Sequence, residues 1–369
     1  MEATPVRRIK LYTDLKYCSG TSPLLKSLNP IVLAHYDSGT IEEKIIKHHA
    51  RFTHFELTPN IFEADWCILP SIWTAYVGNG TIYKAQEFAK IADKNNKLVL
   101  VWAGGDPEWI IPISNAIQVQ EGLHSIISRK VAFAFERPGF VDDYVEKHFQ
   151  GRWKPLSKGQ QPLVGFCGMA EARFKSRVHF YIQNTINLAN YRLGRNAFVP
   201  VLYGFPVDLR ARALGLLKQS DSVQTDFIIR DVYRGGVSKS GPNLDEHATR
   251  LEFVNNILDT AYTVCVRGGG NFSKRFYETL ACGRIPVLVD TDCVLPYQEF
   301  IDWEKQIVLV EYENLDQIVD KVLEFHNKLT PGEFEELQVA NRELWRTMLS
   351  VRGYYQNFHR YLPIAKMKA

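Results

Sequence analysis

Short apolar runs, rich in β-branched residues, alternate with longer amphipathic stretches along most of this sequence. Runs of this kind are typical of buried parallel strands, and the stretches between them are typical of the helices that connect such strands. One example is the run 97–106, KLVLVWAGGD, which follows the stretch 81–96, TIYKAQEFAKIADKNN. The alternation predicts an α/β fold in which helices cover parallel sheets.

The same reading places strands and helices along the chain. Strands are expected at residues 7–14, 64–70, 97–106, 130–136, 163–168, 261–267, 285–290 and 306–312. Helices are expected at residues 81–96, 173–193, 245–258, 272–283 and 315–329, and across 331–361. From residue 193 to about Asn243 no regular pattern is visible, so we expect an irregular region there.

The length of 369 residues exceeds a comfortable single core and predicts two domains. Residues 151–162, GRWKPLSKGQQP, are polar, rich in glycine, proline and lysine, and without apolar periodicity. We therefore expect one domain at 1–155 and a second at 156–369. Open parallel sheets bind ligands at the carboxyl ends of their strands, so a ligand is expected between the two halves.

Composition excludes several classes of protein. The 44 basic and 41 acidic residues give a net charge of +3, which is too balanced for a nucleic-acid binder held by a basic face. The six cysteines form no CxxC pair and no zinc-like spacing, and we expect small buried side chains. The N-terminal residues lack the apolar core of a signal peptide, and no apolar run is long enough to span a membrane, so a cytoplasmic protein is expected. The basic end 365–369, AKMKA, allows a peripheral membrane contact.

The stretch 266–292, VRGGGNFSKRFYETLACGRIPVLVDTD, reads as a strand, a glycine turn, a helix and a second strand. Ser273 is placed as the helix cap and Gly283 as its stop. Two cations, Lys274 and Arg275, stand in the first helical turn, where each costs about 0.3–1 kcal/mol against the helix macrodipole, and Arg267 precedes the turn. The glycines bring backbone amides close to a ligand, so the stretch predicts a phosphate site.

An internal ion pair is the alternative explanation of these cations. Glu278 stands four residues after Lys274 on the same helical face. This order of charges is the weaker orientation and contributes at most about 0.2–0.5 kcal/mol. A bound anion therefore accounts better for the cations than a charge-balanced surface helix does.

Two nucleotide motifs were compared with the same stretch. Gly268, Gly270 and Ser273, followed by Asp290 at the end of the next strand, imitate a dinucleotide fingerprint, but the third glycine is missing. The GxxxxGK[ST] motif of a P-loop is absent from the sequence. A nucleoside diphosphate attached to another group remains.

Residues 261–303 resemble the signature of the exostosin-type glycosyltransferases. The matching elements are Arg267-Gly268, Ser273-Lys274-Arg275-Phe276-Tyr277-Glu278, Cys282-Gly283-Arg284-Ile285-Pro286-Val287, Leu295-Pro296 and Ile301-Asp302-Trp303. Weaker similarities lie upstream, at 9–15, 63–70 and 163–177. The resemblance thus spans nearly the whole chain, with the second half carrying most of it.

The resemblance implies a GT-B architecture, in which two Rossmann-like domains face each other across a cleft and the C-terminal helix crosses back to the first domain. It implies transfer of a sugar from a nucleotide donor, usually UDP-linked, to a glycan or lipid-linked glycan in polysaccharide biosynthesis, with inversion and without an obligatory metal or other cofactor. It also implies a soluble member of bacterial type, or a shortened chain.

The resemblance also assigns the donor site. Arg267, Ser273 and Arg275 would address the diphosphate, and Glu278 would bind the ribose hydroxyls. The remaining donor-binding candidates are Gly268, Gly269, Gly270, Asn271, Lys274, Arg177 and Arg230, with Arg173 beside them. Asp290 and Asp292 have the Asp-x-Asp spacing of a metal site in another glycosyltransferase fold, but for these residues we expect a turn or ribose-side role.

An inverting transfer needs a general base on the acceptor hydroxyl. Asp106, in WAGGDPEW, is our candidate because it follows a strand of the first domain; Asp14, Glu108 and His35 are alternatives. Trp73, Trp102 and Trp109 could stack on acceptor sugars, although core packing is the default for tryptophan.

Two other functions stay open at this point. One is a catalytically inactive partner that keeps the nucleotide pocket, and the other is an NAD-type oxidoreductase based on Gly268, Gly270 and Asp290. The donor sugar, the nucleotide base, the acceptor and the oligomeric state are not written in any motif.

Overall fold

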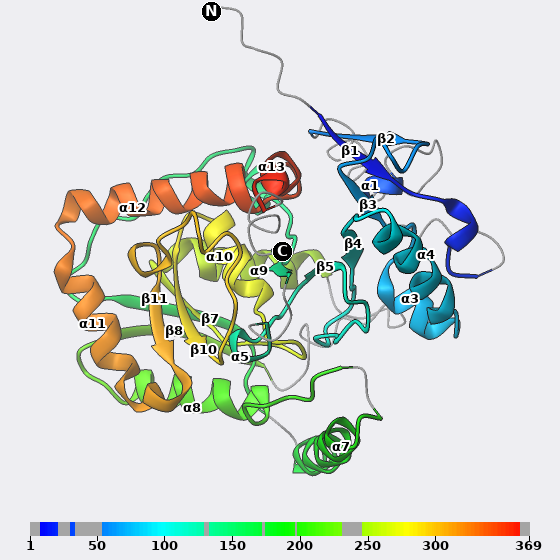
Figure 1. Cartoon of the computed structure of the whole chain (residues 1–369). Helices are drawn as coiled ribbons and strands as arrows, with labels where there is room; N and C mark the ends of the chain where they lie inside the picture. The colour runs from blue at the N-terminus through cyan, green and yellow to red at the C-terminus, as the bar shows by residue number, and fades with distance from the viewer. Residues whose placement is uncertain are drawn as a thin grey trace, which may run out of the picture. The chain divides into compact units, whose positions relative to one another are not determined.

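The computed structural model describes residues 8–20, 30–33, 54–128, 133–171, 174–195, 198–230 and 246–361. Contacts divide the chain into two compact units (Figure 1). The first comprises residues 1–138 and 347–369, and the second comprises residues 139–346. Among the described residues, no helix is both long and apolar enough to cross a bilayer.

The first unit is built on a six-stranded parallel sheet with the order β2-β1-β3-β4-β5-β6. Its strands are β1 (Ile9–Tyr12), β2 (Phe55–Thr58), β3 (Trp66–Ile68), β4 (Val99–Trp102), β5 (Ala116–Gln120) and β6 (Ala134–Glu136). Its helices are η1 (Leu15–Tyr17), α1 (Pro30–Leu33), α3 (Trp73–Gly78), α4 (Ile82–Lys94), α5 (Ser125–Ser128), η6 (Trp345–Leu349, which begins in the second unit), α13 (Val351–Asn357) and η7 (Phe358–Arg360). Every residue of β4 and β5 is buried, as expected for central parallel strands.

The last part of the chain belongs to the first unit. Phe358 packs against Trp102, with ring centroids 5.2 Å apart, and Tyr361 stacks on Phe135 at 4.5 Å. The expectation that the C-terminal helix returns to the first domain is therefore confirmed.

The second unit is built on a five-stranded parallel sheet with the order β11-β10-β9-β7-β8. Its strands are β7 (Leu163–Met169), β8 (Gln224–Arg230), β9 (Tyr262–Cys265), β10 (Ile285–Asp290) and β11 (Val308–Glu311). Its helices are α6 (Tyr144–Phe149), α7 (Phe174–Arg192), α8 (Pro206–Lys218), α9 (Glu246–Asp259), α10 (Lys274–Ala281), η4 (Trp303–Lys305), η5 (Tyr312–Gln317), α11 (Ile318–Lys328) and α12 (Pro331–Leu344). In Figure 1 the sheet lies between α12 and α8.

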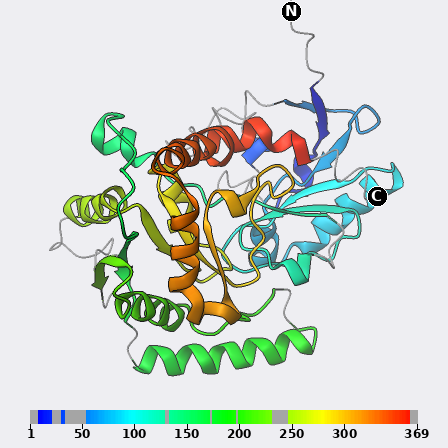
Figure 2. The ribbon, with the colours of Figure 1, turned by 90° about the vertical axis from the view of Figure 1, so that its left-hand side faces the viewer.

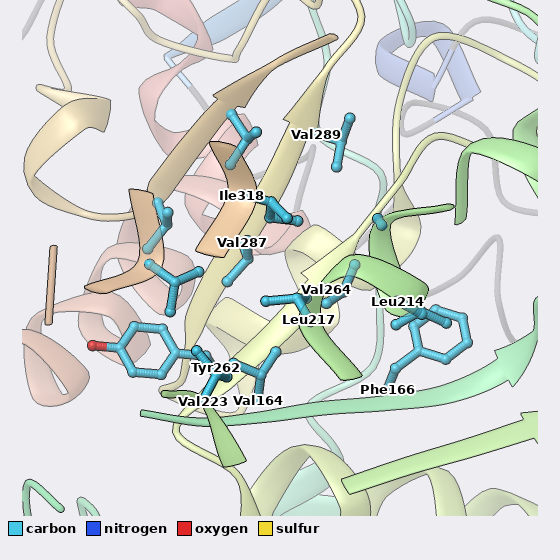
Figure 3. Close-up of a cluster of buried hydrophobic side chains, with 14 of the residues drawn as sticks. Val164, Phe166, Leu214, Leu217, Val223, Tyr262, Val264, Val287, Val289 and Ile318 are labelled. Atoms are coloured by element: carbon cyan, nitrogen blue, oxygen red, sulfur yellow. The ribbon is translucent and has the colours of Figure 1, made fainter. Parts of the chain in front are cut away.

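The core of the second unit is mainly aliphatic. Val164, Val264 and Val287 come from three neighbouring strands, and Leu217 and Ile318 come from the helices that cover them (Figure 3). All five side chains are fully buried. Burying such a side chain contributes about 1.5–3 kcal/mol, so this core holds the strand ends in fixed register.

Proline is tolerated in the central strand β10 for a local reason. The amide of Ile285 donates to the carbonyl of Ala261 on the β9 side, so the next residue, Pro286, turns its nitrogen toward β11. Pairing with β11 begins only at Val287, opposite Val308. No ladder hydrogen bond is therefore lost at Pro286.

The expectation of an irregular region up to Asn243 is wrong over residues 206–230. Helix α8 begins with Pro206 at its first position, and β8 pairs along its whole length with β7. The strand escaped recognition because it is an edge strand with mixed, partly exposed residues, QTDFIIR, instead of a continuous apolar run.

The expected boundary segment, residues 151–162, lies within the second unit. Its side chains fasten it there: the indole nitrogen of Trp153 donates to the carbonyl of Cys282, and Lys158 donates to the carbonyl of Leu329. A stretch without apolar periodicity can still be ordered when it makes such contacts.

Candidate functional site

Four strand ends meet at one edge of the second sheet. Because β7, β8, β9 and β10 are parallel, their carboxyl ends lie on the same side, and Met169 of β7 pairs with Arg230 of β8 there. Asp290 is the last residue of β10. The loop after β9 and the start of α10 carry most of the donor-site candidates, at the edge where open parallel sheets bind ligands.

The glycine loop follows β9 directly. Its ends are tied together by a hydrogen bond of 3.0 Å from the amide of Gly268 to the carbonyl of Phe272. A Cβ added at Gly268 would meet no atom within 4 Å, so there is open space beside this backbone. Gly269 is exposed and Gly270 is buried. The loop therefore presents backbone to open space on at least one side.

Ser273 occupies the cap position of α10 without acting as a cap. Its backbone is extended, at φ −122° and ψ 116°, but its side chain makes no capping hydrogen bond. The side chain is nevertheless buried, at 7% exposure. The first amides of α10 thus lack the hydroxyl partner that a serine at this position usually supplies.

Arg267 is a buried cation that pairs with no carboxylate of the described residues. It is 2% exposed, and its Nη2 donates to the carbonyl oxygens of Tyr203 and Gly204, at 3.0 and 2.6 Å. Its Nε is buried and has no hydrogen-bond partner within the described ranges. Burial lowers the pKa of Arg267 to about 10, which leaves the guanidinium charged at neutral pH.

Arg275 is held in the same manner from the first turn of α10. Its guanidinium carbon lies 4.0 Å from the ring centroid of Phe166, and its Nη2 donates to the carbonyl of Cys167 at 2.6 Å. A Cβ at Gly168 would lie 2.6 Å from that Nη2, so glycine makes room for the guanidinium. Burial lowers the pKa of Arg275, and its Nε also lacks a partner in the part of the chain that is described.

The ion pair offered as an alternative, between Lys274 and Glu278, does not form. Lys274 is exposed and pairs with no carboxylate of the described residues. Glu278 is 9% exposed; its Oε1 accepts a hydrogen bond of 2.9 Å from Tyr144 and lies 3.9 Å from Arg250. Burial and the neighbouring Glu278 raise the pKa of Tyr144, so its hydroxyl remains a donor.

Asn271 joins the glycine loop to the loop that follows β10. Its amide donates to the carbonyl of Asp292, and its Oδ1 accepts from Thr291 at 2.6 Å. Asp290 accepts a hydrogen bond of 2.7 Å from the amide of Cys293, which is the turn role expected for it. Burial raises the pKa of Asp290, and this hydrogen bond opposes the rise.

A pocket of about 600 Å³ opens beside this loop. It is lined by Asp290, Cys293, Leu295, Gln298, Glu299, Phe300, Ile301, Asp302, Trp303, Glu304 and Leu309. The sulfur of Cys293 lies 3.7 Å from the Oδ1 of Asn271, so the pocket adjoins the glycine loop. Its size is that of an ordinary small-molecule site.

Two further arginine candidates are already compensated by carboxylates. Arg177 donates to Asp208 through Nε and Nη2, at 3.0 and 2.8 Å, on the exposed surface. Arg230 pairs with Glu252 at the end of β8. Arg173 lies outside the described residues.

The candidates of the first unit have separate roles. Asp106 is exposed and follows Gly104 and Gly105, which both have left-handed backbones, at φ +78° and +79°. Asp14 caps η1 by accepting from the amide of Lys16. Trp73 and Trp102 are buried at 0% and 4% exposure, so they belong to the core. His35 lies outside the described residues.

Glu108 forms a buried pair that the sequence did not indicate. Its Oε2 lies 2.6 Å from the Nδ1 of His124, and both side chains are buried. The sequence analysis also did not name three residues of the second unit that contact the candidate site: Tyr144, Arg250 and Arg210. Arg210 donates to the carbonyls of Met169 and Arg267. These partners are distant in sequence, so no local spacing could have revealed them.

Comparison with known proteins finds a family model that matches part of the second unit. Residues 216–325 match the family model described as the Exostosin GT47 domain. The resemblance to exostosin-type glycosyltransferases is therefore confirmed over this part of the chain. The expected fold class is confirmed as well, because two helix-covered parallel sheets form the pair of Rossmann-like units that defines GT-B proteins.

Individual relatives match less of the chain. A probable glucuronosyltransferase 47 A of Physcomitrium patens is 39% identical over 62 residues, which are 17% of this chain and 14% of that protein. A structure of TarM from S. aureus, solved in complex with fondaparinux, alpha-GlcNAc-glycerol and UDP, is 12% identical with a TM-score of 0.36, over 80% of this chain and 54% of TarM. A glycosyltransferase of Rickettsia africae ESF-5 is 11% identical with a TM-score of 0.32, over 98% and 99%. Scores this low carry no information about function.

Proposed function

We propose that this chain is a glycosyltransferase that moves a hexose or pentose from a UDP-sugar to a hydroxyl group of a glycan or lipid-linked glycan acceptor, in polysaccharide synthesis. The observation that carries the proposal is the combination at the start of α10. Ser273 makes no capping bond there, and the buried Arg267 and the half-buried Arg275 donate to backbone carbonyls and form no ion pair with a described carboxylate. Free amides and cations together favour a bound anion, and a diphosphate supplies one.

The chemistry follows from where charge develops. During transfer the bond between the anomeric carbon and the diphosphate oxygen breaks, and the diphosphate leaves with an additional negative charge. The guanidinium groups of Arg267 and Arg275 stabilise that charge more strongly than they stabilise the bound donor, because the charge on the diphosphate grows as the bond breaks. The reaction then needs no obligatory metal ion.

Carboxylates line the pocket beside the glycine loop, whereas arginines lie at the loop itself and at the start of α10. The carboxylates of Asp290, Asp302 and Glu299 line the pocket, where they repel phosphate but accept hydrogen bonds from sugar hydroxyls. The Oε2 of Glu278 makes no hydrogen bond to a described residue, and we assign it to the ribose hydroxyls. The pocket thus takes the uncharged parts of the donor, and the arginines take the diphosphate.

We assign the general base to Asp106. Its exposed carboxylate takes the proton of the acceptor hydroxyl while the acceptor oxygen attacks the anomeric carbon from the face opposite the leaving diphosphate. One carbon–oxygen bond forms as the other breaks, so a single displacement inverts the anomeric centre.

Titration and turnover test this proposal together. Thermal-shift titrations with UDP, GDP, CMP-sugars and NAD, each with and without EDTA, are followed by mass-spectrometric detection of transfer products. We expect UDP to stabilise the fold with EDTA present, and Glu278→Ala to weaken donor use at least about tenfold. Stabilisation by NAD alone would instead support an oxidoreductase. Tight UDP binding without turnover on any acceptor would support an inactive partner subunit.

A further inference from the structure

Helix α7 (Phe174–Arg192) is the least buried long element of the second unit. It has 19 residues, and none of their side chains is buried. Figure 2 shows it as a rod along the lower edge, apart from the strands of its sheet. A helix of this length needs a packed face for its stability, so the question is which face it presents to the rest of the chain.

One narrow stripe of α7 contacts its own unit. Phe180 packs on Phe205, with ring centroids 4.7 Å apart. Asn184 exchanges two hydrogen bonds with the backbone of Val201, of 2.9 and 3.1 Å. Asn187 and Tyr191 continue this stripe at helical spacing and are half-buried. Half of the contacting stripe is therefore made of polar asparagines.

The opposite face of α7 is apolar and exposed. Its large side chains recur every three to four residues, so they form one continuous stripe. They are Phe174 (75% exposed), Val178 (40%), Tyr181 (47%), Ile182 (57%) and Ile186 (49%), and Leu193 (63%) follows at the end. An ordinary surface helix turns its apolar side inward, whereas α7 turns it outward.

The charge on this segment has a single sign. Residues 174–195 include Lys175, Arg177, Arg192 and Arg195, and no aspartate or glutamate. Arg177 is compensated by Asp208. Lys175, Arg192 and Arg195 are exposed and pair with no carboxylate of the described residues. An exposed apolar stripe is thus flanked at both ends by uncompensated cations.

We propose that α7 is a membrane-docking helix that lies flat on a bilayer containing anionic lipids. The apolar stripe would enter the boundary between headgroups and acyl chains, and the three cations would contact the lipid phosphates. A second copy of the chain is a poorer occupant, because a symmetric pairing of two α7 stripes would bring like charges together. This proposal concerns membrane attachment and does not depend on the proposed transferase chemistry.

The test is vesicle co-sedimentation of the full chain. Vesicles of phosphatidylcholine alone are compared with vesicles that also contain phosphatidylglycerol, at low and high NaCl. We expect binding to the anionic vesicles only, and weaker binding at high salt, since salt screens the headgroup attraction. The double substitution Ile182→Glu with Ile186→Glu is expected to reduce binding at least about tenfold, because it places two charges in the apolar stripe.

Val339→Glu provides the matched control. Val339 is 47% exposed on α12, a helix of the same unit, so this variant adds a charge at a comparable site outside α7. We expect it to bind vesicles as the unchanged protein does. Circular dichroism melting should be the same for all variants, because Ile182 and Ile186 are exposed.

Three outcomes would overturn the proposal. One is equal binding to neutral and anionic vesicles, and another is full binding by the double variant. The third is a dimer, measured by light scattering, that the double variant breaks into monomers, which would make α7 a contact between copies. UDP binding is expected to be unchanged in the double variant, so failure of this proposal is distinguishable from failure of the proposed function.

Discussion

Two helices of the second unit begin in opposite ways. α12 starts with a capping box: Thr330 accepts from the amide of Glu333 at 3.3 Å, and Glu333 accepts from the amide of Thr330 at 2.8 Å. Its first turn carries an acid, which the helix macrodipole favours. α10 starts after Ser273, which makes no capping bond, and its first turn carries Lys274 and Arg275.

The difference between the two helix starts distinguishes a terminus that stabilises its own helix from one that has unsatisfied amides. The start of α12 satisfies its own amides and has no need of a ligand. The start of α10 has no side-chain cap, although a cap typically contributes about 1 kcal/mol to helix stability. It also carries positive charge, which is unfavourable at the positive end of the helix macrodipole. A chain keeps such an arrangement where an external anion supplies what is missing. The comparison therefore indicates a structural role for the α12 terminus and supports the binding role that we propose for the α10 terminus.

The largest effect is expected from Arg275→Met. This substitution keeps the apolar stem on Phe166 and removes the charge, so kcat for sugar transfer should fall about 100-fold or more. Arg284→Met is the matched control, because the Arg284 guanidinium likewise donates to carbonyl oxygens, those of Leu258 and Lys154. It should lower the melting temperature and leave kcat of the folded enzyme unchanged. Equal losses of kcat in both variants would contradict a special role for α10.

Ser273→Ala and Thr330→Ala should give reciprocal results. Since the Ser273 hydroxyl makes no cap, its loss should leave the unfolding free energy nearly unchanged while UDP affinity falls about tenfold. Loss of the Thr330 hydroxyl should cost about 1 kcal/mol of stability and leave UDP affinity unchanged. Urea unfolding and isothermal titration measure the two quantities. A loss of stability in Ser273→Ala would mean that this serine is a structural cap.

Lys274→Glu should move stability and binding in opposite directions. An acid in the first turn of α10 favours the macrodipole, so the ligand-free protein should gain about 0.3–1 kcal/mol. The same charge repels a diphosphate, so the donor KM should rise several-fold, and more strongly at low salt. Lys328→Glu, in the last turn of α11, is the control and should leave the KM unchanged. A lowered KM in Lys274→Glu would exclude an anion at this terminus.

The smallest effect concerns pH and the start of α12. Hydrogen bonds from Thr330 lower the pKa of Glu333 below its usual 4.5. A carboxylate whose pKa is lower in the folded protein contributes stability that is present above 4.5 and is lost as pH falls through the folded pKa. The urea midpoint should therefore depend less on pH in Glu333→Gln than in the unchanged protein, in the acidic range. A parallel pH dependence of the two proteins would show that the capping box does not hold the carboxylate.

Most strands and helices could be predicted because the pattern of apolar residues within each segment indicates which of its side chains are buried. Fully buried runs such as 262–265 and 285–290 are apolar at nearly every position, which a sequence displays directly. β8 was missed because an edge strand with mixed, partly exposed residues lacks that signal, and α8 was missed although it has 13 residues. Residues 347–369 belong to the first unit through contacts with residues far away in the sequence. Local patterns could not predict these contacts, but the family resemblance did.

The candidate site was only partly predictable. The cations and glycines around α10 were visible as a charge pattern that a free helix disfavours. The hydrogen-bond partners of these side chains could not be predicted from the sequence. Tyr144 donates to Glu278, 134 positions away, and Arg275 donates to the carbonyl of Cys167, 108 positions away. Pairing of Arg177 and Arg230 with carboxylates likewise depends on elements that meet only in the fold.

The sequence by itself determined the alternation of strands and helices and the accumulation of positive charge at one helix start, because both depend on residues close together in the chain. Only the tertiary structure decided that Ser273 leaves α10 uncapped, that Arg267 and Arg275 donate to carbonyl groups instead of carboxylates, and that α7 faces outward with its apolar side. Those features depend on which distant groups approach within hydrogen-bond or van der Waals distance, and chain folding alone sets those approaches.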